Sequence, residues 1–185
     1  MKLKNTLRTI ATSARSSLQD VRQVLSSTQD TTMVSGDTDR FDSLIAGVRG
    51  SGHEIIATEL GTSRRLPGET GAVAHRVFQE MLTNAIKHGR RDQPITAERH
   101  WLATRSAGGV ADTLRIEVTN MTEASGTRAS VTEISGHDGA GPGRGLDGMR
   151  RRLEAIGGHL DTHRREQPAG TTFTVTAYLP MRGSS

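Results

Sequence analysis

The segment from about residue 69 to residue 88 constrains the fold most, because it carries two separate stripes at helical spacing. At about 100° per residue, one arc is apolar and predicts the core-facing side of a long helix. This apolar arc comprises Ala74, Phe78, Met81, Leu82 and Ala85. A second arc is polar and comprises Glu80, Asn84, Lys87 and His88. Asparagine is a poor residue for a helix interior, so the polar arc needs a chemical reason.

The polar arc has the groups that a magnesium-dependent phosphoryl-transfer site uses. A carboxylate such as Glu80 can orient or deprotonate a nucleophile, which makes it the candidate catalytic residue. One turn along, the amide oxygen of Asn84 is the kind of hard ligand that Mg²⁺ prefers. Lys87 and His88 can approach phosphate oxygens. The alternative is an ordinary charged surface, in which Lys87 and His88 are favoured by the helix C-terminus.

Elsewhere the hydrophobic pattern predicts a mixture of helices and strands without strict alternation. We expect a short helix at about 40–49, a helix at about 146–156, and strands at about 53–60, 94–104, 112–120, 159–165 and 171–179. Such an order is typical of an α+β fold, a two-layer sandwich with a largely antiparallel sheet. The predicted organisation is a helix in residues 1–30, a linker with a short helix in 31–52, and one domain in 53–181.

A glycine-rich stretch at residues 121–145 has no convincing helix or strand pattern and predicts a long loop. Within a compact domain such a loop is usually functional. Residues 143–148 match G-x-G-x-x-G, but no strand precedes them, which excludes a dinucleotide fingerprint. What remains is a glycine-rich segment that opens a helix, where unpaired N–H groups and the helix dipole favour anions. The alternative is a surface loop that caps a basic helix.

The strand at 112–120 ends in a polar residue. Leu114, Ile116 and Val118 alternate with polar residues, which indicates a half-buried strand. Asn120 continues the buried register. It is either a turn residue, as Asn often is at a strand end, or the floor of a pocket.

The N-terminal residues 4–28 carry an a/d heptad pattern and predict a helix. Its partner is either a second copy of the chain, giving a homodimer, or the chain's own domain. The a and d positions are Leu3, Leu7, Ile10, Ala14, Ser17, Val21 and Val24. No apolar run reaches the roughly 18 residues of a membrane span and no signal peptide is visible, so we expect the chain to be cytoplasmic.

Composition narrows the function classes. Cysteine is absent, which excludes disulfides and thiolate metal sites. The net charge of +4 suggests a nucleic-acid binder, but the chain has only five aromatic residues and lacks a base-stacking platform. Short arginine clusters beside glycines fit a phosphate ligand better, so we expect no direct nucleic-acid partner.

Three segments together resemble a known family. Arg76–His88 resembles the N box of the histidine-kinase branch of the ATPase superfamily that also contains gyrase, heat-shock chaperones and mismatch-repair proteins. Residues 143–158 are similar to its G2 box and following helix, and Gly170–Pro180 to its closing strand. The nearest likeness is to sensor kinases that partner helix-turn-helix response regulators. The resemblance covers residues 50–180 and implies a Bergerat-type ATP-binding fold. Residues 1–28 resemble the second helix of a dimerisation hairpin.

The resemblance implies binding of Mg-ATP and transfer of its γ-phosphoryl group to a histidine on a dimerisation helix, followed by relay to a response-regulator receiver domain. Glu80 would assist the transfer, Asn84 would ligate Mg²⁺, and the 121–145 loop would be the ATP lid. The chain is then expected to be cytoplasmic, or the cytoplasmic part of a membrane-bound sensor. The remaining nucleotide contacts would be Lys87, His88, Asn120, Gly143, Arg144, Gly145, Leu146 and either Thr171 or Thr172.

Two departures from the family pattern matter. Asn120 stands where the family usually has an aspartate that accepts a hydrogen bond from the adenine amino group. Asn keeps a carbonyl acceptor but lacks the charge, which predicts weaker ATP binding. Asp138–Gly141 is a rival for that box, although no strand precedes it. Residues 1–52 also contain no histidine, so the usual phosphoacceptor helix is missing, and we expect either a fragment of a larger sensor or a truncated gene product.

These departures leave two alternatives. One is a non-catalytic dimerising or adaptor module with a degenerate nucleotide site. The other is a serine kinase of the anti-sigma-factor type from the same superfamily, which the dimerisation-like first helix disfavours.

Overall fold

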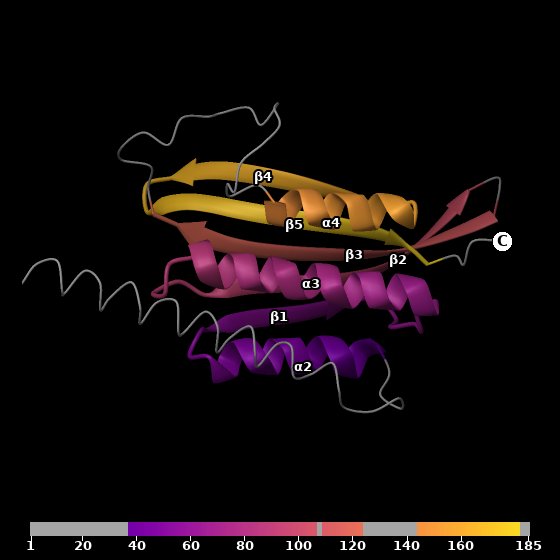
Figure 1. The fold of residues 1–185 in the computed structure, drawn as a ribbon, viewed down its shortest axis with the longest axis horizontal. Helices are drawn as coiled ribbons and strands as arrows, with labels where there is room; N and C mark the ends of the chain where they lie inside the picture. Colours follow the sequence, from indigo (N-terminus) through magenta and orange to yellow (C-terminus); the bar gives the residue numbers. More distant parts are fainter. Residues whose placement is uncertain (1–36, 107–108, 124–143, 182–185) are drawn as a thin grey trace, which may run out of the picture.

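The computed structural model describes residues 37–106, 109–123 and 144–181. The predicted dimerisation helix, most of the predicted lid, Gly143 and the Asp138–Gly141 motif lie outside these residues. The elements along the chain are α2 (Asp37–Gly50), β1 (Ile55–Leu60), α3 (Gly68–His88), β2 (Ile95–Ser106), β3 (Gly109–Thr122), α4 (Arg144–Ala155), β4 (His159–Gln167) and β5 (Gly170–Pro180) (Figure 1). In the described part of the chain, no helix combines the length and apolar character needed to cross a membrane.

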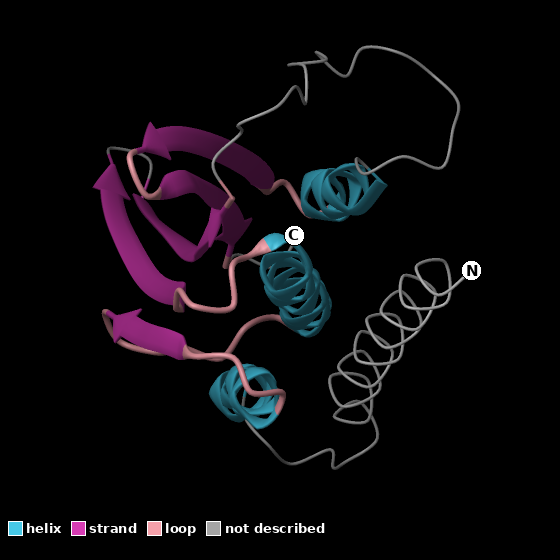
Figure 2. Ribbon diagram, turned by 90° about the vertical axis from the view of Figure 1, so that its left-hand side faces the viewer, coloured by secondary structure: helices cyan, strands magenta, loops and turns pink. Residues whose placement is uncertain are grey.

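The five strands form one mixed sheet in the order β1-β2-β3-β5-β4. β1 and β2 pair in parallel, and the other neighbours are antiparallel. The helices α2, α3 and α4 all lie on the same side of the sheet (Figure 2). The fold is therefore the predicted α+β two-layer sandwich, and α3 is the helix that connects the parallel pair β1 and β2.

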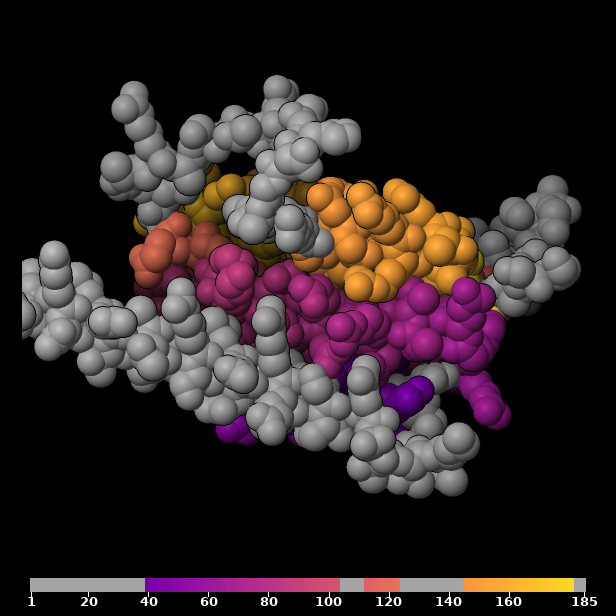
Figure 3. Space-filling view, viewed as in Figure 1, coloured from indigo at the N-terminus to yellow at the C-terminus, as the bar shows by residue number. Residues whose placement is uncertain are grey.

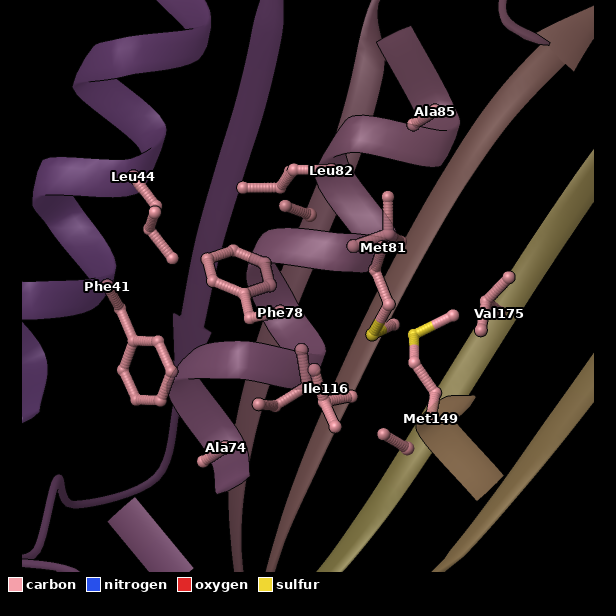
Figure 4. Close-up of a cluster of buried hydrophobic side chains, with 14 of the residues drawn as sticks. Phe41, Leu44, Ala74, Phe78, Met81, Leu82, Ala85, Ile116, Met149 and Val175 are labelled. Carbon is pink, nitrogen blue, oxygen red and sulfur yellow. The ribbon is translucent and has the colours of Figure 1, made fainter. Parts of the chain in front are cut away.

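The core lies between the helices and the sheet, and α3 is at its centre. All five residues of the predicted apolar arc are buried, which confirms the predicted inner side of this helix. The arc contacts side chains from α2, β3, β5 and α4 (Figure 4). Phe41 of α2 meets Phe78 of α3 edge-on, with ring centroids 5.5 Å apart. On the other flank α4 lies directly against α3 (Figure 3).

A buried arginine ties α2 to the sheet. Arg99 of β2 is 5% exposed and donates hydrogen bonds to Asp42 at 2.8 Å and to Glu59 at 3.0 Å. Its guanidinium carbon lies 5.3 Å from the ring centroid of Phe41. The indole N–H of Trp101 donates to the other carboxylate oxygen of Glu59 at 2.6 Å. These contacts fix α2 against β1 and β2.

Two of the element ends that differ from the sequence-based prediction border the predicted loop. β3 continues through Met121 and Thr122, because these residues pair with Thr172 and Thr171 of β5. Their partners lie about fifty residues away in the sequence, so no local pattern marks them as a strand. Helix α4 begins at Arg144, two residues earlier than predicted. The predicted loop is therefore shorter at both ends.

Candidate functional site

A cavity of about 490 Å³ lies between the C-terminal half of α3, the end of β3, the start of β5, the second half of β4 and the first turn of α4. This is within the range of roughly 300–1,000 Å³ that is typical of small-molecule sites. Its apolar lining comprises Met81, Ala85, Val118, Leu146, Phe173 and Val175. Its polar lining comprises Asn84, His88, Asn120, Thr122, Glu123 and Arg164.

The polar arc of α3 faces this cavity and the start of α4. Asn84 and His88 line the cavity. Glu80 lies against α4, since a Cβ atom placed on Gly145 would be 3.0 Å from its Oε1 and 3.4 Å from Asn84 Nδ2. A Cβ atom at this position would require the end of the Glu80 side chain to move by a few tenths of an ångström. The first turn of α4 is thus held directly over the two candidate catalytic and magnesium-binding side chains.

The last turn of α3 carries the two remaining residues of the arc. Lys87 is exposed and does not line the cavity. His88 does line it, and its pKa is lowered from 6.5 by desolvation and then by the charge of Lys87. The imidazole is therefore mostly neutral at pH 7, so it can accept or donate a hydrogen bond but contributes little charge.

Asn120 closes the cavity from the sheet side. It is only 5% exposed, and its Nδ2 has no hydrogen-bond partner among the described residues. Gly89, just after α3, passes so close that a Cβ there would be 3.3 Å from this nitrogen. Because β3 continues beyond Asn120, the residue is not in a turn. Buried polar groups are normally paired, so this amide is suited to a ligand with a hydrogen-bond acceptor.

The two threonine candidates lie on opposite faces of β5. Thr171 shares the helix-facing side with Phe173, is 2% exposed, and its carbonyl accepts a hydrogen bond from Thr122 at 3.1 Å. Successive side chains alternate in a strand, so Thr172 faces the other side. There its hydroxyl accepts a hydrogen bond from Gln167 at 3.0 Å. The structure therefore brings Thr171 to the cavity end of the sheet but not Thr172.

Arg90 fixes the rim of the cavity. Its backbone N–H donates to the carbonyl of Met121 at 2.7 Å, and its guanidinium donates to the carbonyl of Ala169 at 2.6 Å. Gly170 has φ 145°, and a Cβ there would be 2.6 Å from the carbonyl oxygen of Thr122. The ends of α3 and β3 and the β4–β5 turn are thus joined closely around the opening.

The start of α4 supplies the remaining predicted residues. Arg144 is the first residue of the helix, and Leu146 lines the cavity beside Gly145. The first backbone N–H groups of a helix have no partner within it and carry partial positive charge. This end of the site is therefore suited to an anion.

Sequence reasoning missed two cavity residues that strand alternation could have found. Leu160 is buried on β4, and counting by twos from it leads to Arg164 on the same face. Counting from buried Val175 on β5 leads in the same way to Phe173. Both residues line the cavity.

The arrangement fits a nucleotide with a metal ion. An unpaired amide lies at one end, and a helix N-terminus with Glu80 and Asn84 lies at the other. In the described ranges, no three His, Asp or Glu residues gather closely enough to hold a metal by themselves. A metal at Asn84 would thus take its other ligands from phosphate and water, which is how Mg²⁺ is commonly bound.

Comparison with solved structures shows the same architecture in bacterial kinases. The catalytic domain of histidine kinase ThkA aligns with a TM-score of 0.54 at 15% identity, over 78% of this chain and 90% of that one. Mycobacterial sensor histidine kinase MprB aligns at 0.53 and 20% identity, over 80% and 97%. The histidine kinase domain of the blue-light activated kinase from Erythrobacter litoralis EL346 aligns at 0.54 and 17% identity, over 91% and 75%. At these identities the likeness establishes the fold.

Comparison with curated protein sequences gives no match. The family of histidine kinase-, DNA gyrase B-, and HSP90-like ATPases, in contrast, matches residues 70–182. This stretch contains all but the first two residues of α3, the strands β2 to β5 and α4, and hence the whole cavity. Since the match covers more than half of the chain, the protein belongs to the histidine kinase-, DNA gyrase B-, and HSP90-like ATPase family.

Proposed function

We propose that this chain binds Mg-ATP and transfers its γ-phosphoryl group to a histidine on the dimerisation helix of a sensor kinase. The observation that carries this proposal is the contact of Glu80 and Asn84 with the first turn of α4, beside a cavity whose other end holds the unpaired amide of Asn120. Family membership supports the nucleotide, and the likeness to histidine kinase catalytic domains supports the choice of acceptor.

In this proposal the adenine base lies at Asn120. An asparagine side chain can accept a hydrogen bond from the adenine amino group and donate one to a neighbouring ring nitrogen. Thr171 supports this end of the site from β5. The exposed Lys87 and neutral His88 approach the sugar and phosphates from the end of α3.

The phosphates lie at the α4 N-terminus, where Arg144, Gly145 and Leu146 provide backbone N–H groups. Gly143 is proposed as a further contact. Asn84 would hold a magnesium ion, which would supply charge neutralisation of the phosphates. Glu80 orients the incoming histidine and accepts its proton. Catalysis is then mainly positioning and charge neutralisation, as is usual for phosphoryl transfer.

The partners follow from the same reaction. Residues 1–30 would form part of a dimerisation helix, residues 31–52 the connection, and residues 53–181 the catalytic unit. The histidine would be supplied by a dimerisation hairpin, and a response-regulator receiver domain would accept the phosphoryl group from it. We propose a cytoplasmic location for this chemistry.

Calorimetry with ATP, in the presence and absence of Mg²⁺, tests the binding step. We expect saturable binding that strengthens with Mg²⁺, and Asn84→Ala should remove the strengthening. Thr172→Ala is the control, because Thr172 lies on the opposite face of the sheet. A dissociation constant of about 1 mM corresponds to a binding free energy of only about −4 kcal/mol. If no ATP binding is detected at about millimolar ligand, the proposal is rejected.

Radiolabelled Mg-ATP with a separate histidine-bearing dimerisation hairpin tests the transfer step. Glu80→Gln should retain ATP affinity and lose most of the transfer. Binding without transfer to any such hairpin would instead favour the second candidate, a non-catalytic module, which the Asn120 substitution also favours.

A further inference from the structure

A row of three cavity-lining side chains crosses the sheet from β3 to β4. Asn120 of β3 pairs in register with Phe173 of β5, which in turn pairs with Arg164 of β4. All three line the same cavity. Neighbouring strands lie about 4.8 Å apart, so Arg164 is two strands, or roughly 10 Å, from Asn120. The row therefore extends from the proposed base-binding amide to a cation at the opposite side of the cavity.

Arg164 lies on the side of the cavity where α4 begins. Helix α4 packs on β4 and β5, and only a short turn at 156–158 separates its end from the start of β4. The helix and β4 therefore run in opposite directions, and the last part of β4 approaches the first turn of the helix. Leu146 of that turn lines the cavity together with Arg164. A guanidinium and a positive helix end thus share one wall.

Arg164 forms no ion pair within the described structure. Across residues 37–106, 109–123 and 144–181, the ion pairs of arginines involve Arg64, Arg90, Arg99, Arg115 and Arg150. Glu123 also lines the cavity but does not pair with Arg164. A guanidinium is well matched to phosphate, because its planar fork can donate two parallel hydrogen bonds.

We propose that Arg164 is a further nucleotide-binding residue, whose guanidinium contacts the phosphate groups of the ligand. This inference rests on the proposed Mg-ATP site and extends it to β4. The base, held at Asn120, lies above Phe173, and the phosphates run toward α4 and Arg164. The residue acts in binding and in placing the phosphates, and it takes no part in proton transfer.

The neighbouring Arg165 provides a matched control. It is the same residue type on the same strand, it is also exposed, and it pairs in register with Thr172 on the opposite face of the sheet. Both arginines can be replaced by alanine with little expected effect on folding, since neither is buried. A difference between the two variants therefore reports on the cavity and not on net charge.

The experiment measures the affinities of ATP and adenosine for the wild-type chain, Arg164→Ala and Arg165→Ala by calorimetry and ligand-observed NMR. We expect Arg164→Ala to weaken ATP about tenfold, as for loss of a hydrogen bond to a charged group. Its affinity for adenosine, which lacks phosphates, should stay within about twofold, and Arg165→Ala should resemble the wild type with both ligands.

Two results would overturn the inference. If Arg164→Ala weakens the affinities for ATP and adenosine equally, Arg164 contacts the base or supports the folded structure, not the phosphates. If Arg164→Ala and Arg165→Ala weaken the affinity for ATP equally, the effect comes from the net charge of the protein and not from a specific contact. A wild-type chain that binds neither ligand would reject the proposed Mg-ATP function itself, which is a distinct outcome.

Discussion

Replacing Asn120 by leucine should make the ligand-free protein more stable while removing its response to nucleotide. The Nδ2 atom is buried without a partner in the described structure, and such a group costs about 1–3 kcal/mol. Leucine has nearly the same shape and no polar atom, so the free energy of unfolding should rise by up to that amount. For a chain of this size, each kcal/mol corresponds to about 2–4 °C in the melting temperature.

The assay is differential scanning calorimetry of both proteins with and without Mg-ATP. A bound ligand raises the melting temperature of the wild type by mass action, and the variant should lose that increment because the base contact is gone. A fall in the melting temperature of the ligand-free variant would show that the amide is bonded within the fold. An unchanged ATP increment would remove Asn120 from the site. Either result refutes the reasoning.

Three further perturbations test other parts of the structure. Gly145→Val should displace the first turn of α4, because even a Cβ atom added there would be 3.0 Å from Glu80 Oε1. Calorimetry should therefore show weaker Mg-ATP binding. Unchanged affinity would contradict the close approach of Gly145 to Glu80. Arg99→Ala should lower the free energy of urea unfolding by about 2 kcal/mol, because it removes the charge-assisted hydrogen bonds to Asp42 and Glu59. An unchanged free energy of unfolding would show that these bonds do not stabilise the packing of α2 on the sheet. The pKa of His75 is lowered from 6.5 by desolvation and then by two nearby arginines. The unfolded chain therefore takes up the proton first, and stability is lost as the pH falls below about 6.5. His75→Phe should reduce the drop in melting temperature between about pH 7.5 and about pH 5.5, and an unchanged drop would exclude His75 as its source.

The fold was largely predictable because its central helix has two chemically distinct sides. The apolar arc of α3, from Ala74 to Ala85, is buried as its spacing requires. Alternation in β3 likewise predicted that Asn120 continues the buried side of the strand, and it does. Local sequence could not decide whether Asn120 lies in a turn or a pocket, because the answer depends on β5 pairing beyond it.

Two details of the site escaped prediction for different reasons. The position of Gly170 in β5 decides whether Thr171 or Thr172 faces the helices, and no local pattern in a run of threonines reveals it. Arg164 resembled a surface charge because β4 has only one buried residue, Leu160, from which to count. Counting by twos from Leu160 would have placed Arg164 on the helix-facing side, and the pairing of β4 with β5 sets it beside Phe173.

The pairing of β3 with β5 also has a kinetic consequence. The hydroxyls of Thr119 and Thr174 meet at 2.9 Å although 55 residues separate them, and the same pairing brings Asn120 to Phe173. Closing so long a loop is entropically unfavourable, so contacts of this kind tend to form late in folding. A nucleotide that binds the completed cavity therefore stabilises the folded state but not the folding transition state, in which the cavity is incomplete. We therefore expect it to slow the unfolding rate and leave the refolding rate almost unchanged. In a cell rich in ATP, the ligand would then extend the lifetime of each folded molecule without helping any molecule to fold.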